Sequence, residues 1–397
     1  MRRRPIALIL VSHAVVDSCQ NILPVVLPLL QTRFGLSYSQ IGLAAAVLTI
    51  SSSMIQPIFG WISDRWHTQW FLPAGIVWTA VLMGMLGLVP SYWVLVLVLA
   101  LTGVGTAAFH PVASMAAAHA SGVQRGLGMS FFAAGGNLGF ALGPILATWL
   151  LAGFSLKGTT LLMVPGCLMA GAIHWYRREI EVPTRDPERG RAQGTSPIPW
   201  AKLSVLCLLI MLRSWGYSGL IIFIPLFLLD QGVAFMWTGR ALFVFLFFGA
   251  LGGLLGGHLS DRVGRQQVIA ISLLAFPFLM GPALALVGSP RWLFLALAGM
   301  SLLASFSVTI VFAQELLPQR LGLASGLTLG LAFGAGGLGV AMSGVMADLF
   351  GLRTSVWILV LLPGLAGFLA LRLRSPRPVV ESEAAISPVT GELDARL

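Results

Sequence analysis

The amino-acid sequence predicts an all-α integral membrane protein with twelve transmembrane helices in two pseudo-symmetric six-helix bundles. Composition, the lengths of the apolar segments and an internal duplication carry this prediction. Of the 397 residues, 57% are hydrophobic and 10% are charged, whereas soluble domains carry about 25% charged residues. Most of the surface must therefore face lipid rather than water, and the chain cannot fold as a soluble globule.

The distribution of charge excludes a nucleic-acid-binding protein, although the formal net charge is +10. The basic residues form short clusters between apolar segments, without a basic face. The three cysteines, Cys19, Cys167 and Cys207, each lie inside an apolar stretch and lack the spacing of a disulfide framework or a zinc site. We expect neither a disulfide nor a bound metal.

The apolar segments have the length of membrane-spanning helices, which need about 20 residues to cross the hydrocarbon core. The first follows Arg2, Arg3 and Arg4 and has no signal-peptide cleavage site, so we expect it to be retained as a helix. The twelve expected spans are 6–31, 39–62, 70–89, 92–116, 126–152, 157–177, 201–229, 237–259, 268–288, 291–314, 322–347 and 353–373.

The one long polar connection divides the chain into equal halves. Residues 1–177 are expected to form the N-terminal bundle and 201–374 the C-terminal bundle. The polar segment 178–200 is a cytoplasmic linker between them, and 375–397 is a flexible cytoplasmic tail. Each half thus holds six spans.

The positions of the basic residues predict the orientation. If the chain begins in the cytoplasm, eighteen of the 24 Lys and Arg residues fall on the cytoplasmic side and five on the opposite side. Cytoplasmic loops carry the excess of Lys and Arg. We therefore expect a multi-pass protein of a bacterial inner membrane with both termini in the cytoplasm.

The two halves repeat each other. The segment from Gly60 to Arg65 recurs as Gly257 to Arg262, and Arg125 recurs as Arg320, both at an offset of about 196 residues. A parallel repeat of six spans resembles the layout of the major facilitator superfamily, in which the substrate path lies at the interface between the repeats.

The repeated segment also resembles the cytoplasmic signature between the second and third helices of each major facilitator half. We expect Asp64 to approach the start of the eleventh span and Asp261 the start of the fifth, where helix N-termini attract carboxylates. These contacts would latch the outward-facing state. The alternative is an ordinary loop carboxylate beside basic neighbours. The latch residues are Gly60, Asp64, Arg65, Arg125, Gly257, Asp261, Arg262, Gly264, Arg265 and Arg320.

One acidic residue, Asp17, lies near the middle of a span, and intramembrane charges are functional candidates by default. His13, Gln20 and Asn21 share its helix face, which should line a cavity. Adding the repeat offset to Asp17 leads to Arg213 in the seventh span. We hypothesise that the two pair in one state and that protonation of Asp17, or an arriving anion, frees Arg213. The alternative is a static pair that only holds the halves together.

His110 and Glu315 complete the proton-coupling candidates. Imidazole groups titrate near neutral pH, which makes His110 a candidate for proton transfer. The alternative is that His110, beside Pro111, only bonds to the backbone carbonyl that the helix kink leaves free. Glu315 lies where the tenth span meets the cytoplasm and is a gate, a proton exit or a partner of Arg320. Including the residues above, the expected substrate contacts are His13, Gln20, Asn21, Asn137, Arg213, Tyr217 and Ser305.

Glycines recur four residues apart in the fifth span and in the eleventh, a pattern that lets helices pack closely. The segment 334–339 formally matches a dinucleotide-binding fingerprint but follows no strand, so we reject that interpretation. No nucleotide-binding loop or nucleophile motif occurs in the sequence. We expect no enzymatic activity and no cofactor, and a proton gradient as the energy source.

A set of short motifs extends over nearly the whole chain: Ser12-His13 with Asp17 and Gln20, Leu29-Leu30-Gln31, Gln56-Pro57, Phe109-His110-Pro111, Gly135-Gly136-Asn137, Gly264-Arg265 and Ala313-Gln314-Glu315-Leu316-Leu317-Pro318. On these motifs the sequence resembles the fosmidomycin resistance protein family of drug-efflux transporters. Two departures from the family pattern, Val16 and Val112, remove polar groups beside Asp17 and His110 and place more weight on Asp17.

The resemblance implies proton-coupled export of small drugs by alternating access. The charge inventory of Arg213, His110 and His13 against one aspartate suits an anionic or amphiphilic substrate. The alternatives are a metabolite, lipid or metal transporter running as uptake or uniport, and a receptor or scaffold without transport. We expect a monomer in a lipid bilayer, with protons and a small-molecule substrate as its partners and no nucleic acid.

Overall fold

The computed structural model describes residues 2–66, 68–180, 198–318 and 320–373, without the side chains of Arg125, Gly126, Leu321, Gly322 and Ser325. This part of the chain is helical throughout and contains no strand. The helices are α1 Arg3–Gln20, α2 Leu23–Phe34, α3 Tyr38–Arg65, α4 Phe71–Gly84, η1 Met85–Leu88, α5 Tyr92–Ser121, α6 Arg125–Phe154, η2 Ser155–Leu162, α7 Met163–Trp175, α8 Trp200–Asp230, α9 Phe235–Val263, α10 Arg265–Ala285, α11 Ser289–Leu316, α12 Leu321–Phe350 and α13 Leu352–Ala370.

The described helices make twelve crossings, as the sequence predicts. Eleven described segments are long and apolar enough to span a membrane, and one of them, Leu127–Trp175, has 49 residues. At 1.5 Å per residue that segment is more than twice as long as the hydrocarbon core is thick. It turns at Ser155, and η2 and α7 return along α4, so that it supplies two crossings.

The first crossing is broken in the middle. α1 ends at Gln20 and α2 begins at Leu23, with Pro24 in its first turn, where a missing N–H costs no hydrogen bond. The break follows Asp17 by one turn. It therefore leaves the polar face of α1 beside a change in helix direction, where side chains of both helices reach the centre of the molecule.

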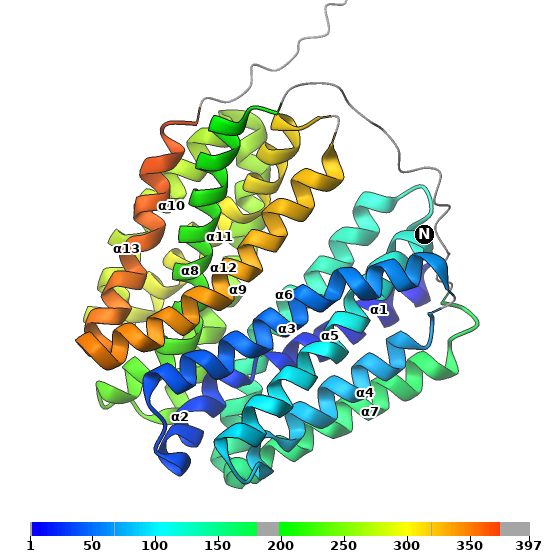
Figure 1. The fold of residues 1–397 in the computed structure, drawn as a ribbon, viewed down its shortest axis with the longest axis horizontal. Helices are drawn as coiled ribbons and strands as arrows, with labels where there is room; N and C mark the ends of the chain where they lie inside the picture. Colours follow the sequence, from blue (N-terminus) through cyan, green and yellow to red (C-terminus); the bar gives the residue numbers. More distant parts are fainter. Residues whose placement is uncertain (1, 67, 181–197, 319, 374–397) are drawn as a thin grey trace, which may run out of the picture.

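The helices gather in two groups, and Figure 1 shows α4, α5, α6 and α7 on one side and α8, α10, α11 and α13 on the other. Within the first group α1 packs against α6, and within the second α8 packs against α12 and α13. The domain limits remain a prediction, because most of the expected linker and the whole of the expected tail lie outside the described residues.

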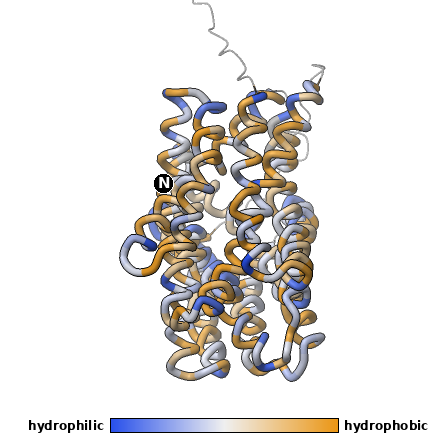
Figure 2. Tube along the Cα trace, turned by 90° about the vertical axis from the view of Figure 1, so that its left-hand side faces the viewer, coloured by the Kyte–Doolittle hydropathy of each residue, from blue (hydrophilic) through white to orange (hydrophobic). Residues whose placement is uncertain are grey.

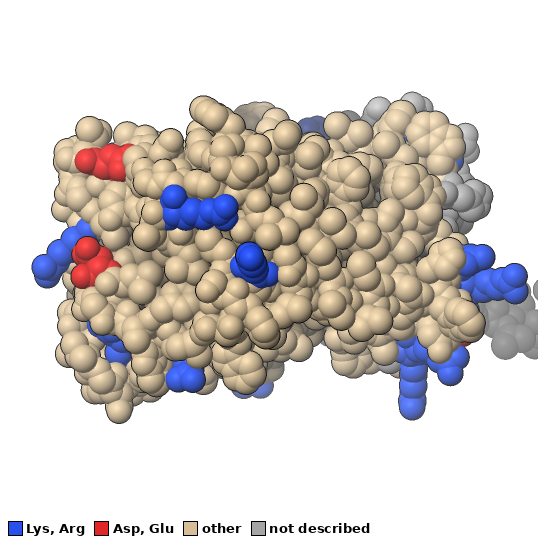
Figure 3. Space-filling view, turned by 90° about the horizontal axis from the view of Figure 1, so that it is seen from below, with Lys and Arg blue, Asp and Glu red and all other residues tan. Residues whose placement is uncertain are grey.

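The outer surface is apolar. Large side chains such as Trp93, Leu254 and Phe278 are exposed, and the tube in Figure 2 is predominantly apolar along the helices. The face seen in Figure 3 carries few charged groups, and a broad uncharged area separates those on the left from those on the right. Such a surface suits a lipid surrounding and not water.

The two groups of helices touch at one end of the molecule and separate at the other. We call the end where α1 and α8 begin and α7 and α13 end the linker end, and the opposite end the far end. In Figure 1, α3 and α12 lie side by side at the far end and diverge toward the linker end.

At the far end a carboxylate bridges the two groups. Asp348 of α12 accepts hydrogen bonds from the backbone N–H groups of Tyr38 and Ser39, each at 2.9 Å, and from the Ser39 hydroxyl. Ser37 caps α3 there in a complete capping box. A carboxylate over the first turn of a helix also benefits from the helix dipole. Asp348 therefore ties α12 to α3.

At the linker end the groups are apart. A side-chain carbon added at Gly326, Gly330 or Gly334 of α12 would have no heavy atom within 4 Å. This face of α12, expected to pack closely, is open in this conformation. By contrast, Gly135, Gly139 and Gly143 of α6 lie against the backbone of the first crossing, as the glycine pattern predicts.

The predicted latch contacts across the linker end are absent from this conformation. Asp64 makes no hydrogen bond or ion pair among the described residues, and Asp261 pairs with Arg265 of its own half. A latch for the opposite conformation is expected to be broken when this end is open. The side chain of Arg125 lies outside the described part.

Of the other latch residues, Gly60, Arg65, Gly257 and Gly264 have their contacts within their own halves. Gly264 has φ 101° and forms the turn between α9 and α10, which favours glycine. Arg65 lies over the Trp61 ring, Arg262 is exposed, and Arg320 is the N-cap residue of α12. A Cβ added at Gly60 would lie nearest to Pro111, and one added at Gly257 nearest to Ser307, each in the same half.

Replacing Asp348 with alanine is expected to reduce the population of the conformation open at the linker end. The change removes three acceptor contacts between α12 and α3. All three are exposed to water, so each contributes about 1 kcal/mol or less. The measurement is the rate at which a cysteine placed at Gly330 reacts with a maleimide in membranes, in a variant without the native cysteines. The same cysteine in an Asp230→Ala background, an exposed far-end acid, is the control. Equal rates in both backgrounds would contradict the role of Asp348.

Replacing Gly139 with alanine is expected to lower the thermal unfolding temperature by several degrees. The new Cβ would lie 2.5 Å from the Ala14 carbonyl oxygen and 2.9 Å from the Asp17 Cβ, so α1 and α6 must separate. Overpacking of this kind costs about 1–3 kcal/mol. Gly153→Ala on the same helix, where no atom lies within 4 Å, should not destabilise the protein. Similar losses in both variants would show that helix propensity, and not packing, is being measured.

Candidate functional site

The candidate site is a cavity of about 460 Å³ between the two groups of helices. Its wall is apolar at the α11 and α12 sides and polar along α1, α3, α5 and α8. The polar side chains on it are those of His13, Asp17, Gln20, Asn21, Thr49, Ser52, Ser53, Gln56, Thr106, His110, Arg213, Ser214, Tyr217 and Ser218.

Asp17 lies between two histidines. The His13 Nε2 is 3.2 Å from one carboxylate oxygen and the His110 Nε2 is 3.2 Å from the other. His13 is one turn earlier on α1, so helix geometry sets that contact, and His110 reaches across from α5. Asp17 is buried with 2% of its surface exposed. We call these three residues the proton cluster.

The backbone fixes which nitrogen of each histidine can exchange a proton. The Nδ1 of His13 is 2.8 Å from the Phe132 carbonyl oxygen, and the Nδ1 of His110 is 2.8 Å from the Thr106 carbonyl oxygen. A carbonyl oxygen only accepts, so both Nδ1 atoms must carry hydrogen. Each Nε2 therefore faces Asp17 either with a lone pair or, once a proton is bound, as a donor.

The contacts in the proton cluster thus depend on bound protons. A neutral imidazole presents its Nε2 lone pair to a carboxylate oxygen, which is repulsive, and a protonated one donates to it. Both Nε2 atoms lie at ion-pair distance from the carboxylate, but the oxygen that faces His110 has no hydrogen-bond partner in this arrangement. The charge of the cluster can therefore be −1, 0 or +1 as it binds no, one or two protons.

Ring contacts hold His13 in place. The Phe132 ring stacks on it with centroids 4.1 Å apart, and the His110 ring meets it edge-on at 5.0 Å. The expected bond between His110 and its own helix exists, but to Thr106 and not to Ala107, the carbonyl that Pro111 leaves free. The bond to the carbonyl that Pro111 frees, the alternative made from the sequence, is therefore not formed, and the role of His110 in proton coupling stays a prediction.

Arg213 lies on the cavity wall formed by the other helix group. It is buried, with 3% of its surface exposed, and donates to the hydroxyls of Thr309 at 3.3 Å and Ser214 at 3.4 Å. Its guanidinium carbon lies 4.9 Å from the centre of the Phe306 ring. No carboxylate of the described residues is within ion-pair distance of it. A buried guanidinium without a counter-ion is costly.

The hypothesised pair between Asp17 and Arg213 is not formed in this structure. The two residues line the same cavity from opposite helix groups, as the repeat predicts, but the histidines take the position beside Asp17. In this conformation the carboxylate and the guanidinium are therefore both available to other partners.

The remaining sequence candidates separate into two sets. Gln20, Asn21 and Tyr217 line the cavity, and the Asn21 amide also donates to the Phe140 carbonyl oxygen. Ser305 is buried and donates to the Leu302 carbonyl oxygen, away from the cavity, and Asn137 is exposed on α6. These last two have no place on the wall of this cavity.

Glu315 lies at the linker end of α11 and does not line the central cavity. Its carboxylate accepts a hydrogen bond from the Arg265 Nε at 3.0 Å, a partner that the sequence did not suggest. Arg265 also pairs with Asp261. Glu315 thus belongs to the charged group that the repeated signature forms with α11.

Sequence reasoning missed the polar wall supplied by α3. Thr49, Ser52, Ser53 and Gln56 lie one or two turns apart on the cavity side of that helix. The signal was the run of small hydroxyl side chains in an otherwise apolar span, which indicates a polar surrounding. The backbone oxygens that orient the histidines leave no such signal.

The proton cluster is also the one group of described His, Cys, Asp and Glu residues close enough together to hold a metal ion, with all ligand atoms within 4.8 Å of one another. The sequence predicts no metal. A dication would share the cavity with Arg213 and only one carboxylate, whereas protons can be added one at a time.

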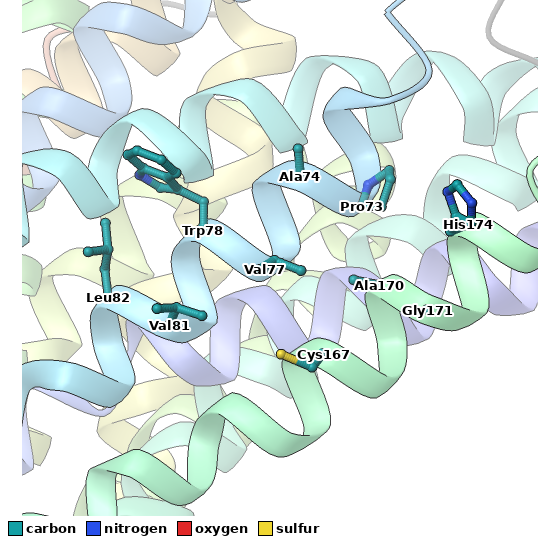
Figure 4. Close-up of a pocket in the computed structure, with 10 residues that line it drawn as sticks. All are labelled: Pro73, Ala74, Val77, Trp78, Val81, Leu82, Cys167, Ala170, Gly171 and His174. Atoms are coloured by element: carbon teal, nitrogen blue, oxygen red, sulfur yellow. The ribbon is translucent and has the colours of Figure 1, made fainter.

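A second hollow, of about 690 Å³, lies between α4 and α7 (Figure 4). Its wall includes Val77, Trp78, Val81 and Leu82 of α4, and Cys167 and His174 of α7. It faces outward on the first helix group and carries no charged pair. It is not a candidate for the functional site.

Comparison with known proteins identifies the family. The family model described as Major Facilitator Superfamily matches residues 9–338, and a second match covers residues 206–392. The chain is 34% identical to the fosmidomycin resistance protein of Escherichia coli strain K12, covering 92% of this chain and 91% of that protein. It is 35% identical to an uncharacterized MFS-type transporter of Bacillus subtilis strain 168, covering 95% and 94% of the two chains.

Solved structures agree on the fold. A bacterial homolog of the human lysosomal transporter Spinster, in an inward-facing and occupied conformation, superposes with a TM-score of 0.77 at 17% identity, covering 93% of this chain and 96% of that one. The nucleoside transporter NupG gives a TM-score of 0.71 at 15% identity, covering 93% and 98%. The chain is a multi-pass membrane transporter, not an enzyme, and it belongs to the major facilitator superfamily.

Proposed function

We propose that this transporter exports small anionic or amphiphilic drug-like molecules, of the fosmidomycin type, from the bacterial cytoplasm in exchange for protons. The observation that carries the proposal is the content of one cavity: a proton cluster on the first helix group and a buried Arg213 without a counter-ion on the second. The transporter works by alternating access in the inner membrane, with no cofactor and the proton gradient as its energy source.

The substrate class follows from Arg213. A buried guanidinium that only hydroxyls and an aromatic ring contact gains most from a ligand that brings negative charge. The cavity volume of about 460 Å³ and its mixture of apolar and polar walls suit a small molecule. The relative in Escherichia coli is named for resistance to fosmidomycin, and that name supports a phosphonate drug as the probe.

Exchange requires that the two bundles can move against each other when protons alone or the substrate alone are bound, and not when both are bound. An unprotonated Asp17 and an empty Arg213 would pair across the cavity and hold the two bundles together. Protons on the cluster neutralise Asp17, and an anion occupies Arg213, so each one breaks the pair. The conformation described here, with Asp17 between two histidines, corresponds to the broken pair.

The same charges favour a second candidate, in which protons and the anion move together into the cell. Protons on the cluster make the cavity more positive, and this raises its affinity for an anion. Cooperative binding of this kind is typical of co-transport and not of exchange. The two candidates share the substrate class and the residues, and they differ in the direction of proton movement.

The direction is measured in proteoliposomes that contain a pH-sensitive dye and are loaded with fosmidomycin. Exchange predicts that fosmidomycin leaving the vesicle drives protons in, and co-transport predicts that protons leave with it. A panel of anionic and cationic drugs then defines the substrate class. Proton movement driven only by cations would overturn the anion preference.

Replacing Asp17 with asparagine is expected to abolish pH-driven transport of fosmidomycin. The amide keeps the size of the side chain but cannot accept a proton from either histidine at neutral pH, so the charge of the cluster no longer follows the gradient. The measurement is drug flux in proteoliposomes with and without a pH difference. Asp230→Asn, at the far end and outside the cavity, should leave the flux intact. An unchanged pH dependence in the Asp17 variant would refute coupling through this residue.

Replacing Arg213 with glutamine is expected to raise the half-saturating fosmidomycin concentration about ten-fold or more, the effect of losing a charged hydrogen-bond donor. Arg213→Lys keeps the charge without the planar fork and should be intermediate. The matched control is Arg240→Gln, which removes a guanidinium that lies over Trp237 outside the cavity. If the control and the Arg213 variants have the same affinity, the anion is bound elsewhere.

A further inference from the structure

A third cavity, of about 710 Å³, lies at the far end of the second helix group. It is formed by the connection from α8 to α9 and the connection from α10 to α11. None of its lining residues lines the central cavity. Whatever occupies it therefore acts apart from the transport site.

Arg291 is a buried cation on the wall of this cavity. Only 6% of its surface is exposed, and its Nη2 donates a hydrogen bond to the Gln231 amide oxygen at 3.0 Å. Its Nε is buried and has no hydrogen-bond partner among the described atoms. No described carboxylate lies within ion-pair distance. A buried guanidinium with an unsatisfied N–H is an energetic cost that a bound acceptor would remove.

The start of α11 adds backbone donors beside Arg291. The helix has 28 residues, and its N-cap is Gly288, which has φ 85° and offers no side-chain cap. The first N–H groups of a helix without a cap lack partners and attract anions. Here Ser289 and Arg291 carry such groups, and Pro290 between them has none. Gly288, Ser289 and Arg291 all line the cavity, so these donors and the guanidinium share one space.

The rest of the wall suits a ligand with an apolar portion. The rings of Trp237 and Trp292 lie 5.3 Å apart on the wall of the cavity. Further along α11, Leu293 and Leu297 are exposed on one helix face, in the position of a lipid-facing surface. The two tryptophan rings therefore supply an apolar surface on the wall that Arg291 shares.

The duplication supplies no counterpart in the first half. The position equivalent to Arg291 is occupied by Leu95, which is fully buried in the apolar core. The buried cation is therefore particular to the second bundle and is not part of the repeated framework.

We propose that this cavity is a second binding site for a phosphate-type oxyanion, with Arg291 and the start of α11 as the donors. The chemistry fits the head group of an anionic phospholipid, and it fits a soluble phosphate ester. The site is separate from substrate transport.

The experiment uses the purified full-length protein in detergent. Native mass spectrometry measures retention of dioleoyl phosphatidylglycerol, with diacylglycerol, which lacks the phosphate, as the lipid control. Calorimetry with glycerol phosphate tests the soluble source. We expect phosphatidylglycerol to be retained over diacylglycerol and its affinity to fall about ten-fold or more in Arg291→Gln.

Two further variants separate binding from folding. Arg353→Gln removes an exposed guanidinium at the same end and should retain the lipid as the wild type does. Arg291→Lys keeps the positive charge and should show an intermediate affinity even if the glutamine variant does not fold.

The outcomes distinguish the sources. Binding of glycerol phosphate that Arg291→Gln abolishes, without selective lipid retention, supports the site and assigns it to soluble esters. Equal retention of both lipids, together with no heat of binding from glycerol phosphate, overturns the proposal. Equal affinities in Arg291→Lys and Arg353→Gln would overturn it as well.

Discussion

Separation of two opposite charges inside a low-dielectric cavity is the constraint on which the rest of this molecule depends. Asp17 and Arg213 belong to different helix groups and line one cavity without contact. Each is buried, and each is held by weaker partners, the histidines in one case and hydroxyls with an aromatic ring in the other. Charges in such surroundings interact strongly. The distance between Asp17 and Arg213 must therefore depend on whether Asp17 and its histidines carry protons.

The packing of the helices explains how this separation is maintained. The glycines of α6 bring the backbone of α1 close, and the carbonyl oxygen of Phe132 on α6 then reaches His13. The proton cluster is therefore built entirely within the first helix group. Arg213 belongs wholly to the second group, with Thr309 and Phe306 beside it. A motion of one group against the other would change the distance between the charges and leave each local arrangement intact.

Much of the architecture could be predicted from the sequence, because apolar length and internal repetition are local properties. The twelve crossings and the placement of Asp17, His13, His110 and Arg213 on one cavity follow from span length, helix spacing and the repeat offset. The return of the chain through η2 was harder to see, since α6, η2 and α7 form one continuous apolar segment.

Contacts that depend on the backbone could not be predicted. Carbonyl oxygens orient both histidines, and any residue would present the same oxygen. Whether a polar residue lines the cavity also depends on the direction in which its side chain points from the helix. Ser305 has the polar spacing expected of a cavity residue, yet it turns to its own helix backbone, and Asn137 faces outward. The Asp348 contact joins segments more than 300 residues apart, and no pattern in either segment announces the other.

The far-end bridge has a consequence for how this protein can vary. Asp348 is bound largely by main-chain N–H groups, which every residue except proline supplies. The two residues that supply these N–H groups can therefore vary more than the acid on α12, although the Ser39 hydroxyl and the Ser37 cap add to the contact. Related chains should keep an acidic residue on one side of the bridge and show diverse residues, without proline, on the other. A contact in which only one side depends on the residue type lets the residues at the start of α3 vary and preserves the packing of α3 against α12 at the far end.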